Sequence, residues 1–198
     1  MRVESRHNER LRDVARLIAS SRDRRKSGRC VLEGVHLVDV YFTRIGAPDT
    51  LVVLDDALAR PEVADLVTRA PPSRTIVVSR NLFSELATLP ADVALLAVVP
   101  TPKPSVTAPG HFCLLLEDVQ DPGNVGAMIR TAAAAGIDQV LLSRHCAFAW
   151  APKVLRAAQG AHFLTTVVEA VDLAEWIVAF RRVGGRALAT VVSNAMPL

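Results

Sequence analysis

The hydrophobic pattern of the first hundred residues alternates between two kinds of element. Short apolar runs at 30–34, 51–54, 75–78 and 93–99 predict strands. The segments between them favour helices at 35–42, 61–69 and 81–87. A helix that alternates with a strand in this way is typical of a layered fold. Residues 1–99 are therefore expected to form a small α/β/α domain.

The first helix is predicted from its apolar spacing and from its ends. Ser5 is a candidate N-cap, and four apolar residues follow at helical spacing: Leu11, Val14, Ala15 and Ile18. The polar and basic stretch SSRDRRKSGR follows, which predicts a loop before the first long strand. Pro61 opens a later helix, where its missing N–H costs nothing.

A proline-rich segment then separates two series of elements. Four of the twelve prolines fall within residues 100–110, which favours a semi-rigid linker. The second series, 111–198, alternates again and ends with an apolar run at 187–192. Strands joined by helical crossovers indicate a parallel, doubly wound sheet in this second domain.

Composition and charge narrow the function classes. The chain has 198 residues, of which 51% are hydrophobic and only 5% aromatic, so its core must be made of Val, Leu and Ala. Residues 1–30 hold ten Arg or Lys against four Asp or Glu, a net charge of +6 in a chain whose total is +3. A basic end on a near-neutral body fits contact with nucleic acid, and it fits a solvated helix face equally well.

The cysteines and the first residues bear on the cellular compartment. Cys30, Cys113 and Cys146 lie far apart, which argues against a zinc site and against a disulfide framework and fits a reducing cytoplasm. The first ten residues form no apolar signal region. No apolar run approaches the roughly 18 residues that cross a membrane, so no membrane partner is expected.

The stretch EDVQDPGNVGAMIRTAAAAG, residues 117–136, carries the candidate chemistry. It follows an apolar strand, and ligands of parallel sheets bind beyond the carboxyl ends of strands. Pro122 and Gly123 predict a turn, Asn124 could cap a helix or bind a ligand, and Gly126 permits a close approach. Arg130 is the lone charge on the helix. From the spacing alone, a capping turn with a surface arginine explains this stretch somewhat better than a binding site does.

Two stretches of the second half resemble one family. LLLEDVQDPGNVGAMIRTAAAAG closely resembles the first motif of the SpoU/TrmH family of RNA ribose 2′-O-methyltransferases, in the SPOUT superfamily. APKVLRAAQGAHF, residues 151–163, is similar to the second, with Ala158 and Gln159 as mild departures.

The first half adds to this resemblance. Ser5, Asn8, Arg24, Arg25 and LEG at 32–34 resemble the L30e-like substrate-binding domain that precedes the catalytic domain in many members. Together, the matches cover most of residues 5–192. That leading domain favours ribosomal over transfer RNA.

The resemblance implies a reaction and a set of residues. The cofactor is S-adenosyl-L-methionine (AdoMet), and the methyl group passes to a ribose 2′-hydroxyl. Asn124 and Arg130 carry over as catalytic residues, with Gly123 and Gly126 as supporting residues. Because a guanidinium stays protonated, we expect Arg130 to grip a phosphate and polarise the hydroxyl rather than to act as a base.

The roles of several further residues have two interpretations. Glu117 orients Arg130 or is a plain surface carboxylate. Lys153 and Arg156, three positions apart, touch RNA phosphates or only solvate their helix. The basic loop fits a salt-sensitive grip on the RNA backbone by Arg22, Arg24, Arg25 and Lys26. His162, beside a strand start, is predicted to be structural.

Two motifs that the family carries after this point, a Gly-rich Asn-Glu-Gly-like loop and a Ser-Leu-Asn-like segment, do not occur in the sequence. The resemblance therefore predicts a SPOUT domain truncated before its knot, with only Thr190 left to touch the cofactor. It also implies a homodimer for the complete protein. The alternative function is a catalytically inactive RNA-binding fragment or remnant of such an enzyme.

Overall fold

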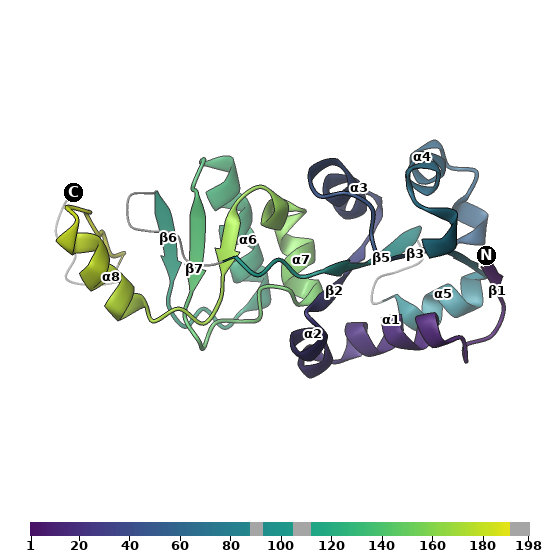
Figure 1. Cartoon of the computed structure of the whole chain (residues 1–198), viewed down its shortest axis with the longest axis horizontal. Helices are drawn as coiled ribbons and strands as arrows, with labels where there is room; N and C mark the ends of the chain where they lie inside the picture. The colour runs from purple at the N-terminus through teal and green to yellow at the C-terminus, as the bar shows by residue number, and fades with distance from the viewer. Residues whose placement is uncertain (88–92, 105–111, 191–198) are drawn as a thin grey trace.

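The molecule is built from two separate sheets arranged along one long axis (Figure 1). The computed structural model describes residues 1–87, 93–104 and 112–190. A five-stranded sheet lies in the first hundred residues, and a three-stranded sheet follows it. The linker predicted at 100–110 lies between these sheets, partly outside the described residues. The division into domains at this segment stays a prediction.

The five-stranded sheet is mixed in direction. Its strand order is β1-β4-β3-β5-β2, in which β1, β4 and β3 run parallel and β5 runs antiparallel to both β3 and β2. The strands predicted in this half are confirmed, and a short first strand is added. Their bounds are Arg2–Val3, Arg29–Glu33, Thr50–Leu54, Thr75–Val78 and Leu95–Pro100 for β1 to β5.

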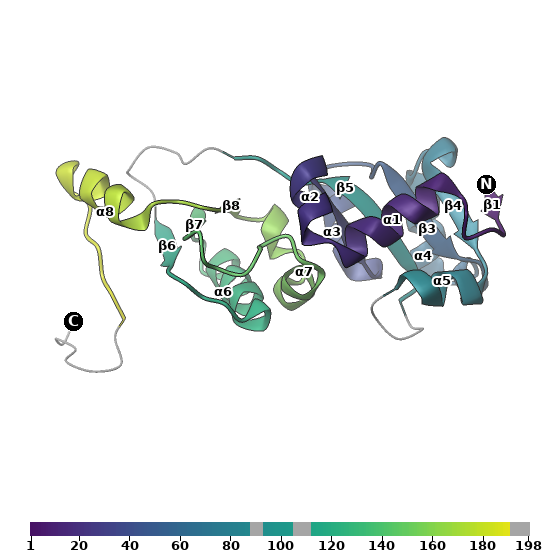
Figure 2. The same ribbon diagram turned by 90° about the horizontal axis from the view of Figure 1, so that it is seen from below.

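Helices cover both faces of this sheet (Figures 1 and 2). Helices α1 and α5 lie on one side of the sheet, and α3 and α4 lie on the other. This is the α/β/α layering that the pattern predicts. The bounds are Glu9–Ala19, Ser21–Ser27, Val35–Arg44, Pro61–Arg69 and Arg80–Leu86 for α1 to α5, with 3-10 turns at Asp55–Ala57 and Pro72–Arg74.

The start of α1 differs from the prediction. Asn8, not Ser5, is the N-cap, and its side-chain oxygen accepts the N–H groups of Arg10 and Leu11 at 3.0 and 3.4 Å. Ser5 instead makes a turn just before the helix, where its carbonyl accepts the Asn8 N–H at 3.1 Å. Asn8 takes the role because the first helical turn needs an acceptor directly in front of it.

The predicted basic loop is wrong, because Ser21–Ser27 forms helix α2. Ser20 caps its start by accepting the Asp23 N–H at 3.1 Å. Gly28 ends it in the left-handed conformation, at φ 63°, that glycine adopts without strain. Two turns of helix therefore present the basic residues, and helical geometry decides which of them reach solvent.

The second sheet is parallel, with the order β6-β7-β8 (Cys113–Leu116, Gln139–Leu142 and Thr166–Val168). Helices lie on both of its faces, as in a doubly wound fold. Alternate residues of the strands pack into the main core with α6 and α7, and the others, such as Leu141 and Val168, meet the first turn of α8. The helices are Pro122–Ala134, Pro152–Ala158 and Leu173–Arg182 for α6 to α8, with a 3-10 turn at Ala161–Phe163.

The strand predicted at 187–192 does not form in the described residues, which end at 190. After α8 the backbone turns at Gly184, with φ 85°, and leads away from the sheet. Leu188 is 70% exposed, so the described part of this run has neither a partner strand nor a covering layer. An apolar run needs both to become a buried strand. The predicted truncation before the knot stays a prediction.

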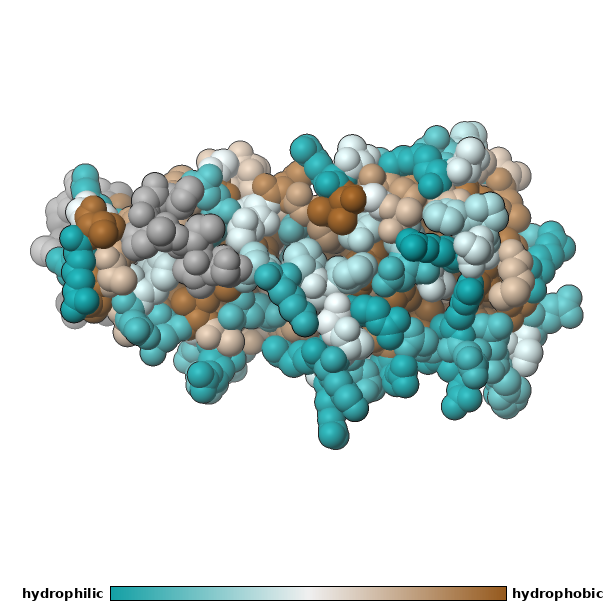
Figure 3. Space-filling view, viewed as in Figure 1, coloured by the Kyte–Doolittle hydropathy of each residue, from teal (hydrophilic) through white to brown (hydrophobic). Residues whose placement is uncertain are grey.

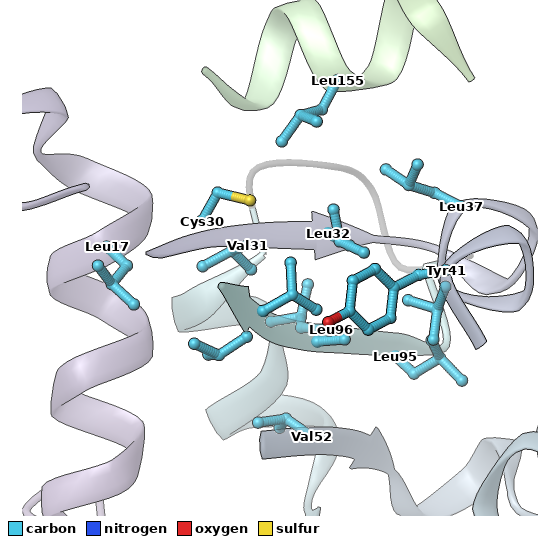
Figure 4. Close-up of a cluster of buried hydrophobic side chains, with 14 of the residues drawn as sticks. Leu17, Cys30, Val31, Leu32, Leu37, Tyr41, Val52, Leu95, Leu96 and Leu155 are labelled. Carbon is cyan, nitrogen blue, oxygen red and sulfur yellow. The ribbon is translucent and has the colours of Figure 1, made fainter. Parts of the chain in front are cut away.

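One hydrophobic core runs through both sheets. Leu155 of α7 is buried and lies over Cys30 and Leu32 of β2, so a helix of the second half covers a strand of the first (Figure 4). Tyr41 of α3 meets Phe163 edge to face, with ring centroids 5.2 Å apart. The two halves are therefore packed together and not only tethered.

Candidate functional site

The DPGN stretch opens helix α6 directly. Asp121 is the N-cap, and its carboxylate accepts the Asn124 N–H at 2.8 Å. Pro122 and Gly123 are the first two helical residues, so the separate turn predicted there is absorbed into the helix. Because Asp121 already caps the helix, Asn124 is not the cap. Its side chain is exposed, and the catalytic role predicted for it stays a prediction.

Gly126 is where α6 and α7 come closest. A Cβ at this position would lie 2.5 Å from the Ala157 Cβ and 2.6 Å from the Val154 carbonyl oxygen. The close approach predicted for Gly126 is therefore confirmed, and the approaching group is backbone of α7 rather than a ligand. This contact fixes α7 against the inner side of α6.

Arg130 lies on the outer side of α6, a little over two turns from its start. The inner side is defined by the buried residues Val125, Gly126, Ile129 and Ala132. Asn124 and Arg130 are both exposed on the other side. Within the described residues, no hydrogen bond or ion pair joins Arg130 to Glu117, which is exposed at the end of β6. The orienting role predicted for Glu117 stays a prediction.

The carboxyl ends of β6, β7 and β8 lie at one edge of the sheet, beside the start of α6 (Figure 1). Asp118 and Ala170, each two residues beyond a strand, have left-handed backbones at φ 51° and 58°. Ser143 Oγ accepts the Asp118 N–H at 2.9 Å and donates to its carboxylate at 2.8 Å. Non-glycine residues hold such conformations only where the surroundings enforce them, and this is common at functional sites.

The loop at 143–151 is anchored near its end by the half-buried Glu169 and the buried His162. Glu169, just after β8, accepts the Ala149 N–H at 2.9 Å, and the His162 Nε2 donates to the Ala149 carbonyl at 2.8 Å. Burial lowers the pKa of His162 to about 4, so the ring is neutral at pH 7. This is the structural role predicted for His162. In the middle of the loop, the Ala147 N–H donates to the Val119 carbonyl at 2.8 Å, which connects this loop to the residues just before the DPGN stretch.

The four basic residues of α2 have different environments. Arg24 is 5% exposed, and its guanidinium donates to the Leu17 and Ile18 carbonyls at 2.5 and 2.9 Å, at the end of α1. The RNA contact predicted for Arg24 is therefore wrong, because the side chain is used to cap a helix. The Arg25 guanidinium lies 4.0 Å from the ring centroid of Phe148. Arg22 and Lys26 are exposed.

The remaining predicted residues lie apart. Lys153 and Arg156 are exposed on α7. Thr190 is exposed beyond α8 and belongs to no strand in the described residues, and the cofactor contact predicted for it stays a prediction. A cavity of about 440 Å³ lies elsewhere, at the amino ends of β7 and β8, and is lined in part by Ile45, Pro102 and Leu164. This cavity is at the opposite edge from Asn124.

Sequence reasoning missed Asp118, Ser143, Phe148 and Glu169. A signal was present for three of them, because each is a polar residue within two positions of the carboxyl end of a predicted strand. Phe148 had no such signal.

Two features are absent from the part of the chain that the structure describes. These residues contain no group of three or more His, Cys, Asp or Glu that could hold a metal ion. Among the same residues, no helix is both long enough and apolar enough to span a membrane.

Comparison with known proteins gives the fold a family. Residues 111–198 match the model of the SpoU rRNA Methylase family. A Bacillus subtilis protein, 23S rRNA (guanosine(2553)-2′-O)-methyltransferase RlmP, is 32% identical over 195 residues, which cover 98% of this chain and 75% of that protein. The zebrafish mitochondrial rRNA methyltransferase 3A is 32% identical over 170 residues, but this chain covers only 39% of its length.

Solved structures agree on the fold. An AdoMet-bound rRNA methyltransferase from Sinorhizobium meliloti superposes with a TM-score of 0.75 at 22% identity, over 92% of this chain and 68% of that one. A TrmH-family protein from Porphyromonas gingivalis gives 0.75 at 25% identity, over 89% and 68% of the two chains. Because one relative is 32% identical over 98% of this chain and the first motif stands at the start of α6, the chain belongs to the SpoU rRNA methylase family.

Proposed function

We propose that the protein transfers a methyl group from AdoMet to a ribose 2′-hydroxyl of RNA, and that ribosomal RNA is the substrate. The observation that carries this proposal is the pair Asn124 and Arg130, exposed on one side of α6 beside the carboxyl edge of a parallel sheet. Membership of the SpoU family and the ribosomal substrates named for its relatives support it.

Arg130 would hold the substrate. A guanidinium offers a fork of N–H donors to one phosphate and stays charged at neutral pH, so it suits binding and orientation rather than proton removal. Gripping the phosphate next to the target ribose would fix the 2′-hydroxyl and offset the negative charge that develops on its oxygen as the hydroxyl proton passes to water. The Asn124 side chain, freed from capping by Asp121, is placed to contact the same substrate.

The negative charges at the carboxyl ends of β6 and β8 are complementary to the positive charge of AdoMet. AdoMet carries a sulfonium cation and supplies the methyl group when bound. The carboxylates of Glu117 and Asp118 after β6 and Glu169 after β8 surround the edge where a ligand of a parallel sheet binds. Of the residues described, these strand ends would hold the cofactor, and Thr190 would not.

RNA would reach this edge along the basic side of the molecule. Hydrophilic residues gather along the lower margin in the view of Figure 3, over α1 and α2. This margin lies on the same side as the carboxyl ends of β6 to β8. Arg22 and Lys26, four positions apart on α2, share one face and are proposed to contact RNA phosphates. Lys153 and Arg156 are proposed as further contacts.

We also propose that the complete protein is a cytoplasmic homodimer. Asn124, Arg130 and Met128, which is 38% exposed, lie on an outer side of α6 that nothing in the described residues covers. A second copy against this side would bury Met128 and complete the site. The three free cysteines fit a reducing compartment. Light scattering during gel filtration would give the oligomeric state.

The first test is a methyl-transfer assay. The purified chain is incubated with methyl-labelled AdoMet and unmodified ribosomal RNA, and label on ribose is measured. Asn124→Ala and Arg130→Ala should lose most of the activity. Arg44→Ala is the matched control, since Arg44 is an exposed helical arginine on α3, on the opposite side from α1.

The alternative function predicts a different pattern. A fragment or remnant without catalysis would bind RNA in a salt-sensitive way, but it would neither bind AdoMet in a calorimetric titration nor transfer a methyl group. Transfer that survives in Arg130→Ala at the level of the Arg44→Ala control would contradict the assigned site.

A further inference from the structure

One arginine of the basic helix α2 is held by the second half of the chain. The Arg25 guanidinium carbon lies 4.0 Å from the ring centroid of Phe148, well inside the range of a cation–π contact. Arg24, the neighbouring residue, also faces this ring at 5.9 Å. Phe148 is in the loop that follows β7, at the carboxyl edge of the three-stranded sheet.

Phe148 is itself held in place by the hydrogen bonds of the residue that follows it. The next residue, Ala149, is fixed through both of its backbone groups: its N–H donates to Glu169 and its carbonyl accepts from His162, at 2.9 and 2.8 Å. Burial raises the pKa of Glu169, whereas its hydrogen bond to the Ala149 N–H and the positive charge of Arg25 act in the opposite direction.

Apolar contacts also join the two halves, among the described residues. Leu155 lies over β2, and Gly160 leaves no space beside Val40, whose side chain would be 3.0 Å from an added Cβ. Those contacts hold the halves together. The contact of Arg25 with Phe148 is the one that reaches the proposed RNA surface.

We propose that Arg25, Phe148 and Glu169 are positioning residues that lock helix α2 to the carboxyl edge of the three-stranded sheet. We call the contacts of these three residues the joint. In the joint, the Arg25 guanidinium contacts the Phe148 ring rather than an RNA phosphate. RNA held by Arg22 and Lys26 would then stand at a fixed distance from Asn124 and Arg130. The last statement rests on the proposed function, but the joint itself does not.

The structure supplies a matched pair of variants. Arg22→Ala and Arg25→Ala remove the same charge from exposed positions of the same short helix. Amide hydrogen exchange of the peptide at 144–151, followed by mass spectrometry, reports on the joint. Exchange should quicken about fivefold in Arg25→Ala, as expected when an ordinary cation–π interaction is removed, and stay unchanged in Arg22→Ala.

Two further variants separate the parts of the joint. Phe148→Leu keeps an apolar side chain but has no ring, so it should quicken exchange as Arg25→Ala does, and the double variant should add nothing. Glu169→Ala removes the acceptor of the Ala149 N–H and should quicken exchange further, whereas Glu169→Gln keeps an acceptor and should restore part of the protection.

The functional consequence is read from binding of a single-stranded RNA oligonucleotide over a range of salt concentration. Removing one cation that neutralises a phosphate lowers the slope of log K against log salt by about 0.7. Arg22→Ala should lower this slope and Arg25→Ala should not. In the methyl-transfer assay, Arg25→Ala should lower kcat more than it raises KM.

The outcomes are distinguishable. If Arg25→Ala lowers the salt slope as much as Arg22→Ala and leaves exchange at 144–151 unchanged, Arg25 is a phosphate contact and the joint does not exist. If the wild-type chain neither binds RNA nor transfers a methyl group, the proposed function fails, while the exchange data still decide whether the joint is present.

Discussion

The contact at Gly126 permits a worked prediction about stability. In Gly126→Ala, the new methyl group would lie 2.5 Å from the Ala157 Cβ and 2.6 Å from the Val154 carbonyl oxygen. Both obstacles belong to α7, and one of them is backbone, so the two helices must separate. Overpacking of this kind costs up to about 3 kcal/mol. Alanine is favoured over glycine inside a helix by about 1 kcal/mol, so the net loss should be about 2 kcal/mol.

The assay measures the stability of the half of the chain that contains Gly126. Both tryptophans, Trp150 and Trp176, are in that half, so their fluorescence during urea unfolding reports its free energy of unfolding. The difference between Thr131→Ala and Thr131→Gly, at an exposed position of α6, measures the helix preference directly. A Gly126→Ala protein that is as stable as wild type would refute the reasoning, because the closeness of α6 and α7 would then not limit the packing.

Three further predictions concern other residues. Arg130→Lys should slow methyl transfer roughly tenfold, since lysine keeps the charge but loses the two-donor grip; a rate near wild type would contradict the positioning role. Arg24→Met should lower the free energy of unfolding by about 2 kcal/mol, because two α1 carbonyls lose a charged donor, whereas Arg22→Met should change it little. The pKa of His162 is about 4 in the folded protein, against an ordinary value of 6.5. Its contribution to the free energy of unfolding is therefore fully present above pH 6.5 and falls by about 3 kcal/mol as the pH drops towards 4. A His162→Gln protein should lack that loss in urea titrations; equal pH profiles would count against a buried neutral ring. Burial raises the pKa of Glu169, so protonation of that carboxyl acts in the opposite direction in both proteins and cancels in the comparison.

The apolar pattern predicted well those strands that are buried in the core. The strands 51–54 and 75–78 are fully or almost fully apolar, and they appear as β3 and β4 within one residue of the predicted bounds. The run at 187–192 has the same local pattern but did not form a strand in its described part. A local pattern shows that a segment can be buried, but only the rest of the fold decides whether a sheet edge is there to receive it.

Polar residues were harder to assign than apolar ones. Arg24, Arg25 and Lys26 look alike in the sequence, yet one caps α1, one lies against Phe148 and one is exposed. Phe148, which contacts Arg25, is distant in sequence, and only the turn between α1 and α2 brings the Leu17 carbonyl to Arg24. Asn124 and Arg130 were located by their motif, but their outward direction depends on the inner side of α6, which the packing against α7 defines.

The strand order of the five-stranded sheet has a consequence for synthesis on the ribosome. Among the described strands, β2 lies at one edge and pairs with β5 alone, which is the last of the five to be made and lies between β2 and β3. Until Pro100 has left the ribosome, β2 has no partner, although it was made some seventy residues earlier. The three-stranded sheet adds its strands in chain order instead. The half that is translated first must therefore wait for its own last strand, and during that interval β2 has the kind of unpaired edge that makes a folding chain prone to aggregation.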